Sequence, residues 1–154
     1  MERRSSLRAT PLAAEIVVHL RKARDLMDAR FAEPLELDDM ARVAGFSRYH
    51  FAREYKAAFG ETPGAYLSRR RVERAKDLLA NANLTVTEVC MVVGFTSLSS
   101  FSRRFSELVG CTPSTYQRRL AERGGPPPIP GCFVMNWGRP GTAIEDKSTR
   151  EPGQ

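Results

Sequence analysis

Residues that build metal sites and disulfide frameworks are scarce in this 154-residue chain. It holds two histidines, His19 and His50, and three cysteines, Cys90, Cys111 and Cys132, each 21 residues after the one before. This spacing provides no close pair of metal ligands, and an odd number of cysteines argues against a set of disulfides. We therefore expect free thiols in a reducing compartment, with no metal ion and no cofactor.

Long apolar runs are also absent. No stretch approaches the roughly 20 apolar residues of a membrane helix, and residues 1–10 are too polar for a secretory signal. No segment alternates with a period of two, which disfavours a sheet or barrel. No Ser/His/Asp set, carboxylate pair or phosphate-binding loop stands out. The sequence thus predicts an all-α protein of the cytoplasm that is not an enzyme and does not enter a membrane.

Positive charge is present in excess and is concentrated in two blocks. The formal net charge is +6. Residues 47–76 carry eight basic and three acidic side chains, a net +5, and residues 96–123 carry five basic and two acidic ones, a net +3. A single basic patch is usually only a solvated surface. Two such blocks about fifty residues apart favour a polyanionic partner.

An internal repeat coincides with the two charged blocks. The second copy follows the first at an offset of 49 residues up to a Gly-Phe pair and of 50 residues after it, so its turn is one residue longer. The matching positions are Gly45-Phe46 and Gly94-Phe95, Phe51 and Phe101, Arg53 and Arg103, Tyr55 and Phe105, Gly60 and Gly110, Thr62-Pro63 and Thr112-Pro113, and Tyr66 and Tyr116.

Each copy predicts two short helices joined by a glycine turn. Gly45 and Gly94 suit a helix end that requires a positive φ. Ser47 and Ser97 can cap second helices over about 47–59 and 97–109, and a Thr-Pro pair then starts the next helix. The inward face should hold Phe51, Tyr55 and Phe59 in copy one and Phe101, Phe105 and Leu108 in copy two. This order describes a helix-turn-helix unit. An ordinary helical bundle is the alternative, but it does not predict the paired basic blocks.

The remaining pattern completes about seven helices. One helix is expected over residues 11 to about 30, with Ile16, Leu20, Ala23 and Met27 facing inward. We expect residues 1–11 to form a polar N-terminal segment, 12–62 the first subdomain, 63–82 a linker helix, 83–123 the second subdomain and 124–154 an irregular Pro/Gly-rich tail. An apolar island at 132–137 either folds back onto the helices or docks onto a partner such as RNA polymerase.

The stretch Arg71-Val72-Glu73-Arg74-Ala75-Lys76-Asp77-Leu78-Leu79, followed by residues 86–95 and the repeat positions after them, resembles the signature of the AraC/XylS DNA-binding domain. The resemblance covers roughly residues 12–122. It implies a transcriptional regulator with two helix-turn-helix subdomains, whose recognition helices enter successive major grooves of double-stranded DNA. Because the tail is too short for the ligand-binding barrel of many members, we expect a stand-alone regulator, associated with the nucleoid.

The expected length of the linker helix agrees with this picture. Residues 63–82 span about 30 Å at ~1.5 Å per residue, close to the roughly 34 Å of one turn of B-DNA. We therefore expect a monomer on an asymmetric site of roughly 20 base pairs. The alternative is a charge-driven protein-interaction module that lacks DNA sequence specificity.

The resemblance also assigns residues to the DNA. Base contacts fall on Tyr49, Ala52 and Arg53 of the first recognition helix and on Leu98, Ser99, Ser102 and Arg103 of the second. The leucine side chain has no hydrogen-bonding group and serine has a single hydroxyl, so copy one should discriminate more than copy two. Phosphate contacts, which set register rather than specificity, are expected from Arg48, His50, Lys56, Arg69, Arg70, Arg104, Arg118 and Arg119.

Overall fold

The computed structural model describes residues 11–124 and 129–130. This part of the chain folds into seven helices: α1 (Pro11–Arg30), α2 (Leu37–Ala44), α3 (Arg48–Phe59), α4 (Pro63–Asn81), α5 (Val86–Val92), α6 (Leu98–Val109) and α7 (Pro113–Arg123). The predicted all-α class and the number of helices are confirmed. The N-terminal residues 1–10, most of the tail and the apolar island at 132–137 lie outside the described residues.

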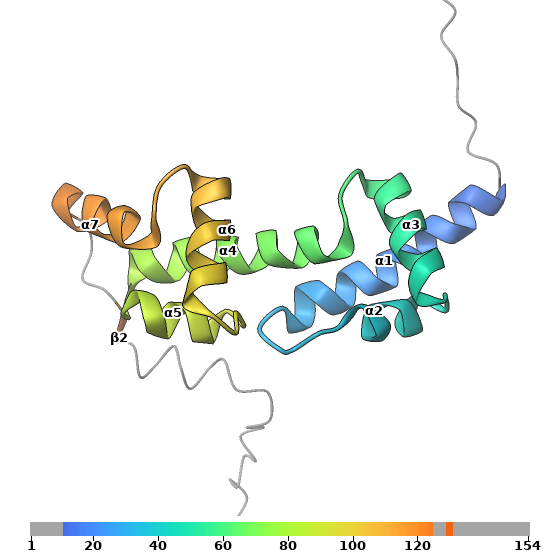
Figure 1. Cartoon of the computed structure of the whole chain (residues 1–154), viewed down its shortest axis with the longest axis horizontal. Coiled ribbons are helices and arrows are strands. Elements are labelled where there is room, and N and C mark those ends of the chain that lie inside the picture. The colour runs from blue at the N-terminus through green and yellow to red at the C-terminus, as the bar shows by residue number, and fades with distance from the viewer. Residues whose placement is uncertain (1–10, 125–128, 131–154) are drawn as a thin grey trace, which may run out of the picture.

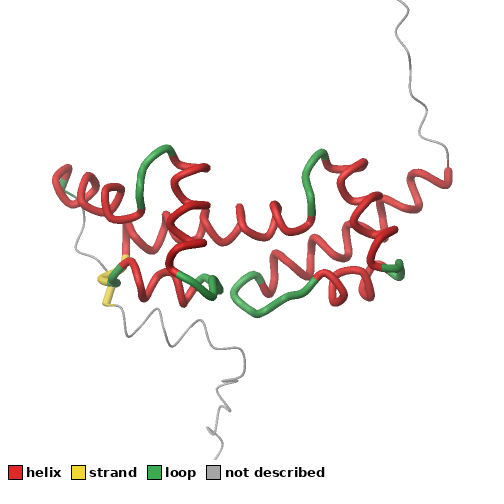
Figure 2. The backbone as a smooth tube through the Cα atoms, viewed as in Figure 1, coloured by secondary structure: helices red, strands yellow, loops and turns green. Residues whose placement is uncertain are grey.

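Two helical groups lie along one long helix (Figure 1). The first subdomain consists of α1, α2 and α3 with the N-terminal end of α4, and the second consists of α5, α6 and α7 with the remainder of α4. Both groups follow the same order of helix, turn, helix and loop (Figure 2). The helices α3 and α6 stand in the same orientation, separated along the length of α4. The repeat in the sequence is therefore a repeat in space.

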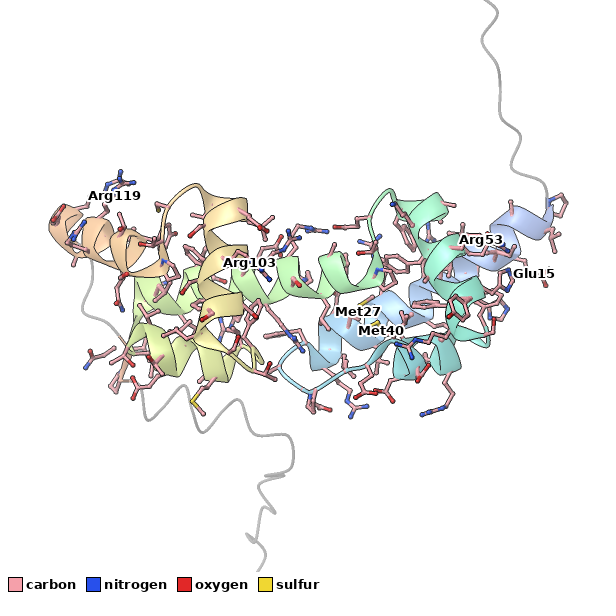
Figure 3. All side chains as sticks on the ribbon, in the orientation of Figure 1. Glu15, Met27, Met40, Arg53, Arg103 and Arg119 are labelled. Carbon is pink, nitrogen blue, oxygen red and sulfur yellow. The ribbon has the colours of Figure 1, made fainter. Side chains whose placement is uncertain are left out.

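Each subdomain has its own apolar core. In the first, Met27 of α1 and Met40 of α2 lie with Phe51 and Tyr55 of α3, and all four are buried (Figure 3). In the second, Val89, Phe101 and Phe105 are fully buried. Burial of such a side chain contributes roughly 1.5–3 kcal/mol. The predicted inward stripe of α1 is confirmed, since Leu20, Ala23 and Met27 are buried and Ile16 packs against them.

Helix α4 belongs to both cores. Tyr66 and Leu67 pack in the first, and Val72, Ala75, Leu78 and Leu79 pack in the second. The helix begins at Pro63, after the N-cap Thr62, whose hydroxyl accepts a hydrogen bond from the backbone N–H of Ala65 at 3.1 Å. It ends at Asn81, because Ala82 is extended and pairs with Ile129 in a two-residue parallel strand pair, β1 (Ala82–Asn83) with β2 (Ile129–Pro130). The sequence did not predict this pairing.

Local hydrogen bonds and glycines set the ends of the other helices. The hydroxyls of Ser47 and Ser97 cap α3 and α6. Gly60 and Gly110 end these helices in the left-handed conformation. Thr85 and Glu88 form a reciprocal capping box, in which the backbone N–H of Thr85 donates to the Glu88 carboxylate at 2.7 Å. These caps fix where each helix begins and ends. They thereby also fix which residues of each helix face the core and which face the solvent.

One inward position of α6 was predicted wrongly. Leu108 is 40% exposed, whereas its neighbour Val109 packs against the second core. The reason is the extra residue in the second turn, which makes Val109 the counterpart of Phe59 at an offset of 50. The aromatic side chains behave as predicted, because Phe101 and Phe105 are buried and Tyr116 packs beside Phe105, with ring centroids 5.5 Å apart.

The assignment of Val109, rather than Leu108, to the inward face of α6 can be tested by measuring stability. Val109→Ala removes two methyl groups from the edge of the core and should lower the free energy of unfolding by about 1 kcal/mol. Leu108→Ala removes more atoms from a more exposed position and should change it by no more than about 0.5 kcal/mol. Urea denaturation of both variants measures the difference. A larger loss for Leu108→Ala would restore the original assignment.

Candidate nucleic-acid interface

Helix α3 presents the predicted base-contact residues on the side away from its core. Phe51 and Tyr55 anchor the helix and are fully buried. On the other side, Tyr49 is 89% exposed, the Arg53 side chain is 76% exposed, and Ala52 lies half-exposed between them. A single exposed aromatic side chain is ordinary on a protein surface. Tyr49 matters here because it lies four residues before Arg53, on the same face of α3.

The charges around α3 are held only loosely. Arg48 lies 3.8 Å from the Asp38 carboxylate, and the Glu54 carboxylate lies 3.6 Å from Arg53 and 3.5 Å from His50. The arginine side chains of these pairs are well exposed, and exposed ion pairs contribute at most about 1 kcal/mol. Arg48 and Arg53 can therefore exchange these carboxylates for another anion at little cost.

Helix α6 offers a similar but less polar surface. Leu98 is 45% exposed and Ser99 is exposed, whereas Ser102 is half-buried. Arg103 is exposed, and its guanidinium has no hydrogen-bond or ion-pair partner among the residues that the structure describes. Arg53 and Arg103 lie at corresponding positions on α3 and α6 (Figure 3). The structure thus places the two arginines of the repeat as equivalent exposed cations.

Further basic residues lie near these two surfaces. Lys56 is exposed near the end of α3, and Arg104 of α6 pairs with Glu107 at 3.3 Å. Arg118 and Arg119 are exposed on α7, and Arg119 lies toward the far end of the molecule (Figure 3). For these four residues the structure leaves the predicted contact with a polyanion open.

Arg69 and Arg70 differ from the other predicted phosphate contacts, because two carboxylates already bind each of their guanidinium groups. Arg69 binds Glu61 at 2.7 Å and Glu73 at 3.0 Å, and Arg70 binds Glu73 at 2.7 Å and Asp28 at 2.8 Å. The hydrogen bond that Arg69 donates to the Glu61 carboxylate raises the pKa of Arg69 above its ordinary value. Because each arginine would have to give up two carboxylate partners to bind a phosphate, we do not propose them as phosphate contacts. They join α4 to the loop before it and to α1.

The described residues contain no cluster of three potential ligands that could hold a metal ion. His19 and His50 instead flank Phe46, with ring centroids 6.2 Å and 4.7 Å from it. Cys90 is buried, which raises the pKa of its thiol. Among the same residues, none of the helices combines the length and the apolar character that crossing a membrane requires.

Proteins of known family are similar to this chain in sequence. A family model described as a helix-turn-helix domain matches residues 40–119, which is more than half of the chain. Over 98 residues the chain is 33% identical to the HTH-type transcriptional activator AarP of Providencia stuartii, and the match covers 64% of this chain and 71% of AarP. Over 91 residues it is 35% identical to the MmsAB operon regulatory protein of Pseudomonas aeruginosa, covering 59% of this chain but only 30% of that protein.

Solved structures show the same fold. The DNA-binding domain of AdpA, determined in complex with a target DNA, matches with a TM-score of 0.64 and 26% identity, over 68% of this chain and 94% of that one. A transcriptional regulator with an AraC-type DNA-binding domain from Chromobacterium violaceum matches with a TM-score of 0.62 and 31% identity, over 72% of this chain and 99% of that one.

Experiments can distinguish basic residues that contact DNA phosphates from basic residues that pair with carboxylates within the protein. Lys56→Gln removes an exposed cation of α3 and should leave stability unchanged, while the salt dependence of DNA binding falls by about 0.9 in the log–log slope if Lys56 contacts one phosphate. Arg69→Gln breaks two partly exposed ion pairs and should lower the free energy of unfolding by about 1 kcal/mol, with no change in slope.

Urea denaturation and duplex binding over a range of salt concentrations measure the two effects. A reduced slope for Arg69→Gln would return this arginine to the set of phosphate contacts.

Proposed function

Because this chain belongs to the AraC/XylS family of transcriptional regulators, we propose that it binds duplex DNA as a monomer, with α3 and α6 in two successive major grooves. The observation that carries this proposal is the pair of similarly oriented helices, α3 and α6, with Arg53 and Arg103 exposed at equivalent positions. The likeness to the AdpA domain, which was solved with a target DNA, supports the same conclusion.

The length of α4 supports the spacing. Its 19 residues extend about 28 Å at ~1.5 Å per residue, and successive major grooves on one face of B-DNA lie about 34 Å apart. The two helix-turn-helix units follow each other in tandem, so the site they bind is asymmetric and roughly 20 base pairs long. A second subunit is not needed to reach both grooves.

The two helices contribute unequally to specificity. Arg53 can donate two hydrogen bonds to the O6 and N7 of guanine, a contact that discriminates by about 1–3 kcal/mol. Tyr49 and Ala52 lie beside it on α3 and can contact a thymine methyl group. On α6, Arg103 provides the main hydrogen bonds, and Leu98 adds an apolar contact. Ser99 and Ser102 add little, because a single hydroxyl distinguishes bases weakly and Ser102 is half-buried.

Further residues hold the DNA backbone. We assign phosphate contacts to the exposed Arg48, Lys56, Arg118 and Arg119, and to the partly buried Arg104 and His50. Ordinary solvated pairs with Asp38, Glu54 and Glu107 give way to phosphates at little cost. In this role the chain acts by binding at the nucleoid rather than by catalysis. Contact with RNA polymerase, for which 132–137 is the candidate segment, would convert binding into regulation.

Selection from a random duplex library tests this proposal. The chain should enrich one asymmetric motif of roughly 20 base pairs with two unequal halves, and its affinity should fall steeply with salt. Enrichment of no motif, with binding that depends on charge alone, would favour a sequence-indifferent interaction module instead.

The same selection, repeated with two variants, tests the assignment of residues. Arg53→Ala should lose preference at one base pair of the better-defined half by about 1–3 kcal/mol, and the rest of the motif should be unchanged. Ser102→Ala should leave the motif as it is. Uniform weakening of all positions by Arg53→Ala would make Arg53 a phosphate contact.

A further inference from the structure

The two subdomains meet at a second place besides the shared helix α4. The loop after α1, residues 31–36, faces the turn between α5 and α6, residues 93–97 (Figure 2). Gly94 of the turn abuts the loop so closely that a Cβ on it would lie 2.7 Å from the carbonyl oxygen of Ala32 and 2.9 Å from its carbonyl carbon. Two backbones from different subdomains are therefore in direct contact.

Arg71 bridges the same junction from α4. Its Nε donates to the carbonyl oxygen of Phe31 at 2.6 Å, and its Nη2 donates to that of Glu33 at 2.8 Å. Its guanidinium carbon also lies 5.9 Å from the centroid of the Phe95 ring, at the edge of the range for a cation–π contact. One side chain thus touches the loop of the first subdomain and the turn of the second.

The environment of Arg71 differs from that of its neighbours. Arg69 and Arg70 pair with carboxylates, whereas Arg71 has no ion-pair partner among the described residues. Burial lowers the pKa of its guanidinium. The carbonyls that it binds belong to the loop that directly follows α1, so they lie near the negative end of that helix. A rigid guanidinium fork suits two carbonyl groups, whereas the single ammonium of lysine does not.

The position of this contact along α4 gives it mechanical importance. Leu67 belongs to the first core and Val72 to the second, so the helix changes from one core to the other between them. Across that interval a single helix joins the subdomains, and a single helix can bend or twist under load. Arg71 lies in this interval and ties the helix to the loop of the first subdomain, close to the turn that leads into α6.

We propose that Arg71 and the Gly94–Ala32 contact lock the two subdomains in one relative orientation, so that the protein selects DNA sites by the spacing of their two halves. This inference rests on the proposed function, since it requires both α3 and α6 to be bound at once. One inserted base pair moves the second half-site by about 3.4 Å and turns it by roughly 35° about the DNA axis. A locked protein cannot follow that change, whereas a hinged one can. Arg71 is therefore a positioning residue for specificity.

The repeat provides a matched pair of glycine variants. Gly45 and Gly94 occupy equivalent turns and both have positive φ, 75° and 94°. A Cβ on Gly45 would meet nothing within 4 Å, whereas a Cβ on Gly94 would collide with the Ala32 backbone. Gly45→Ala and Gly94→Ala share the strain of the left-handed conformation. Only Gly94→Ala also forces the two subdomains apart.

The first test measures affinity for the selected site and for versions with one base pair inserted or removed between its halves. The wild-type chain should bind the altered sites about 100-fold more weakly, a loss comparable to one or two mismatched base pairs. Arg71→Gln and Gly94→Ala should reduce this ratio to about 10-fold or less. Arg74→Gln, at an exposed position on α4, and Gly45→Ala should keep the wild-type ratio. An unchanged ratio in both junction variants would overturn the proposal.

The second test needs no DNA. Spin labels on Glu15→Cys and Glu122→Cys, which are exposed on α1 and α7, report the distance between subdomains in a chain whose native cysteines are replaced by alanine. The distribution should be narrow in that background, broad in Arg71→Gln and Gly94→Ala, and narrow in the two controls. An equally narrow distribution in the junction variants contradicts the lock. If the wild-type chain shows the narrow distance distribution but binds no specific DNA site, the result contradicts the proposed function and not the lock.

Circular dichroism must show native helix content in each variant. If Arg71→Gln fails to fold, Arg71→Lys takes its place, because lysine keeps the charge but cannot bind both carbonyls. It should then broaden the distance distribution and lower the spacing ratio. Retention of both wild-type values by Arg71→Lys would show that charge alone suffices and would overturn the assigned geometry.

Discussion

The packing of α4 into two cores is the constraint on which the rest of the structure depends. Neither helix-turn-helix unit has a complete core without it, since Tyr66 and Leu67 fill the first and Val72 to Leu79 supply four residues to the second. Because one helix runs through both cores, and Arg71 ties that helix to the loop after α1, each core restricts the direction of the other. The common orientation of α3 and α6 follows from this sharing (Figure 1), and simultaneous entry into two grooves requires that orientation.

Neighbouring arginines of α4 show how environment separates residues of one type. Arg69 and Arg70 are neutralised by carboxylates and serve the fold. Arg71 binds backbone carbonyls at the junction of the subdomains. By contrast, Arg53 and Arg103 project from helices whose inner sides are already anchored by aromatic residues, so they remain available to an anion. The charge blocks in the sequence therefore overstate the charge available to DNA near α4.

Local signals allowed most of the fold to be predicted from the sequence. Caps such as Thr85 with Glu88, and glycine stops such as Gly60, act over three or four residues, so their patterns are visible in a single chain. Glu73 pairs with Arg69 and Arg70 at the helical spacings i+4 and i+3. Asp28, which binds Arg70, and Phe31, which binds Arg71, lie 42 and 40 residues away and have no periodic signature. The pairing of Ala82 with Ile129 is equally remote. The exposed positions on α3 and α6 were predictable, because the buried face of an amphipathic helix also defines its opposite face.

In the proposed complex, one chain engages two successive major grooves through α3 and α6. Hydroxyl-radical footprinting on the selected duplex, at a measured ratio of chain to DNA, tests it most directly. We expect two protected patches on one face of the DNA, about one helical turn apart, both present when a single chain is bound. A single patch at that ratio, or a second patch that appears only when a second chain binds, would contradict it.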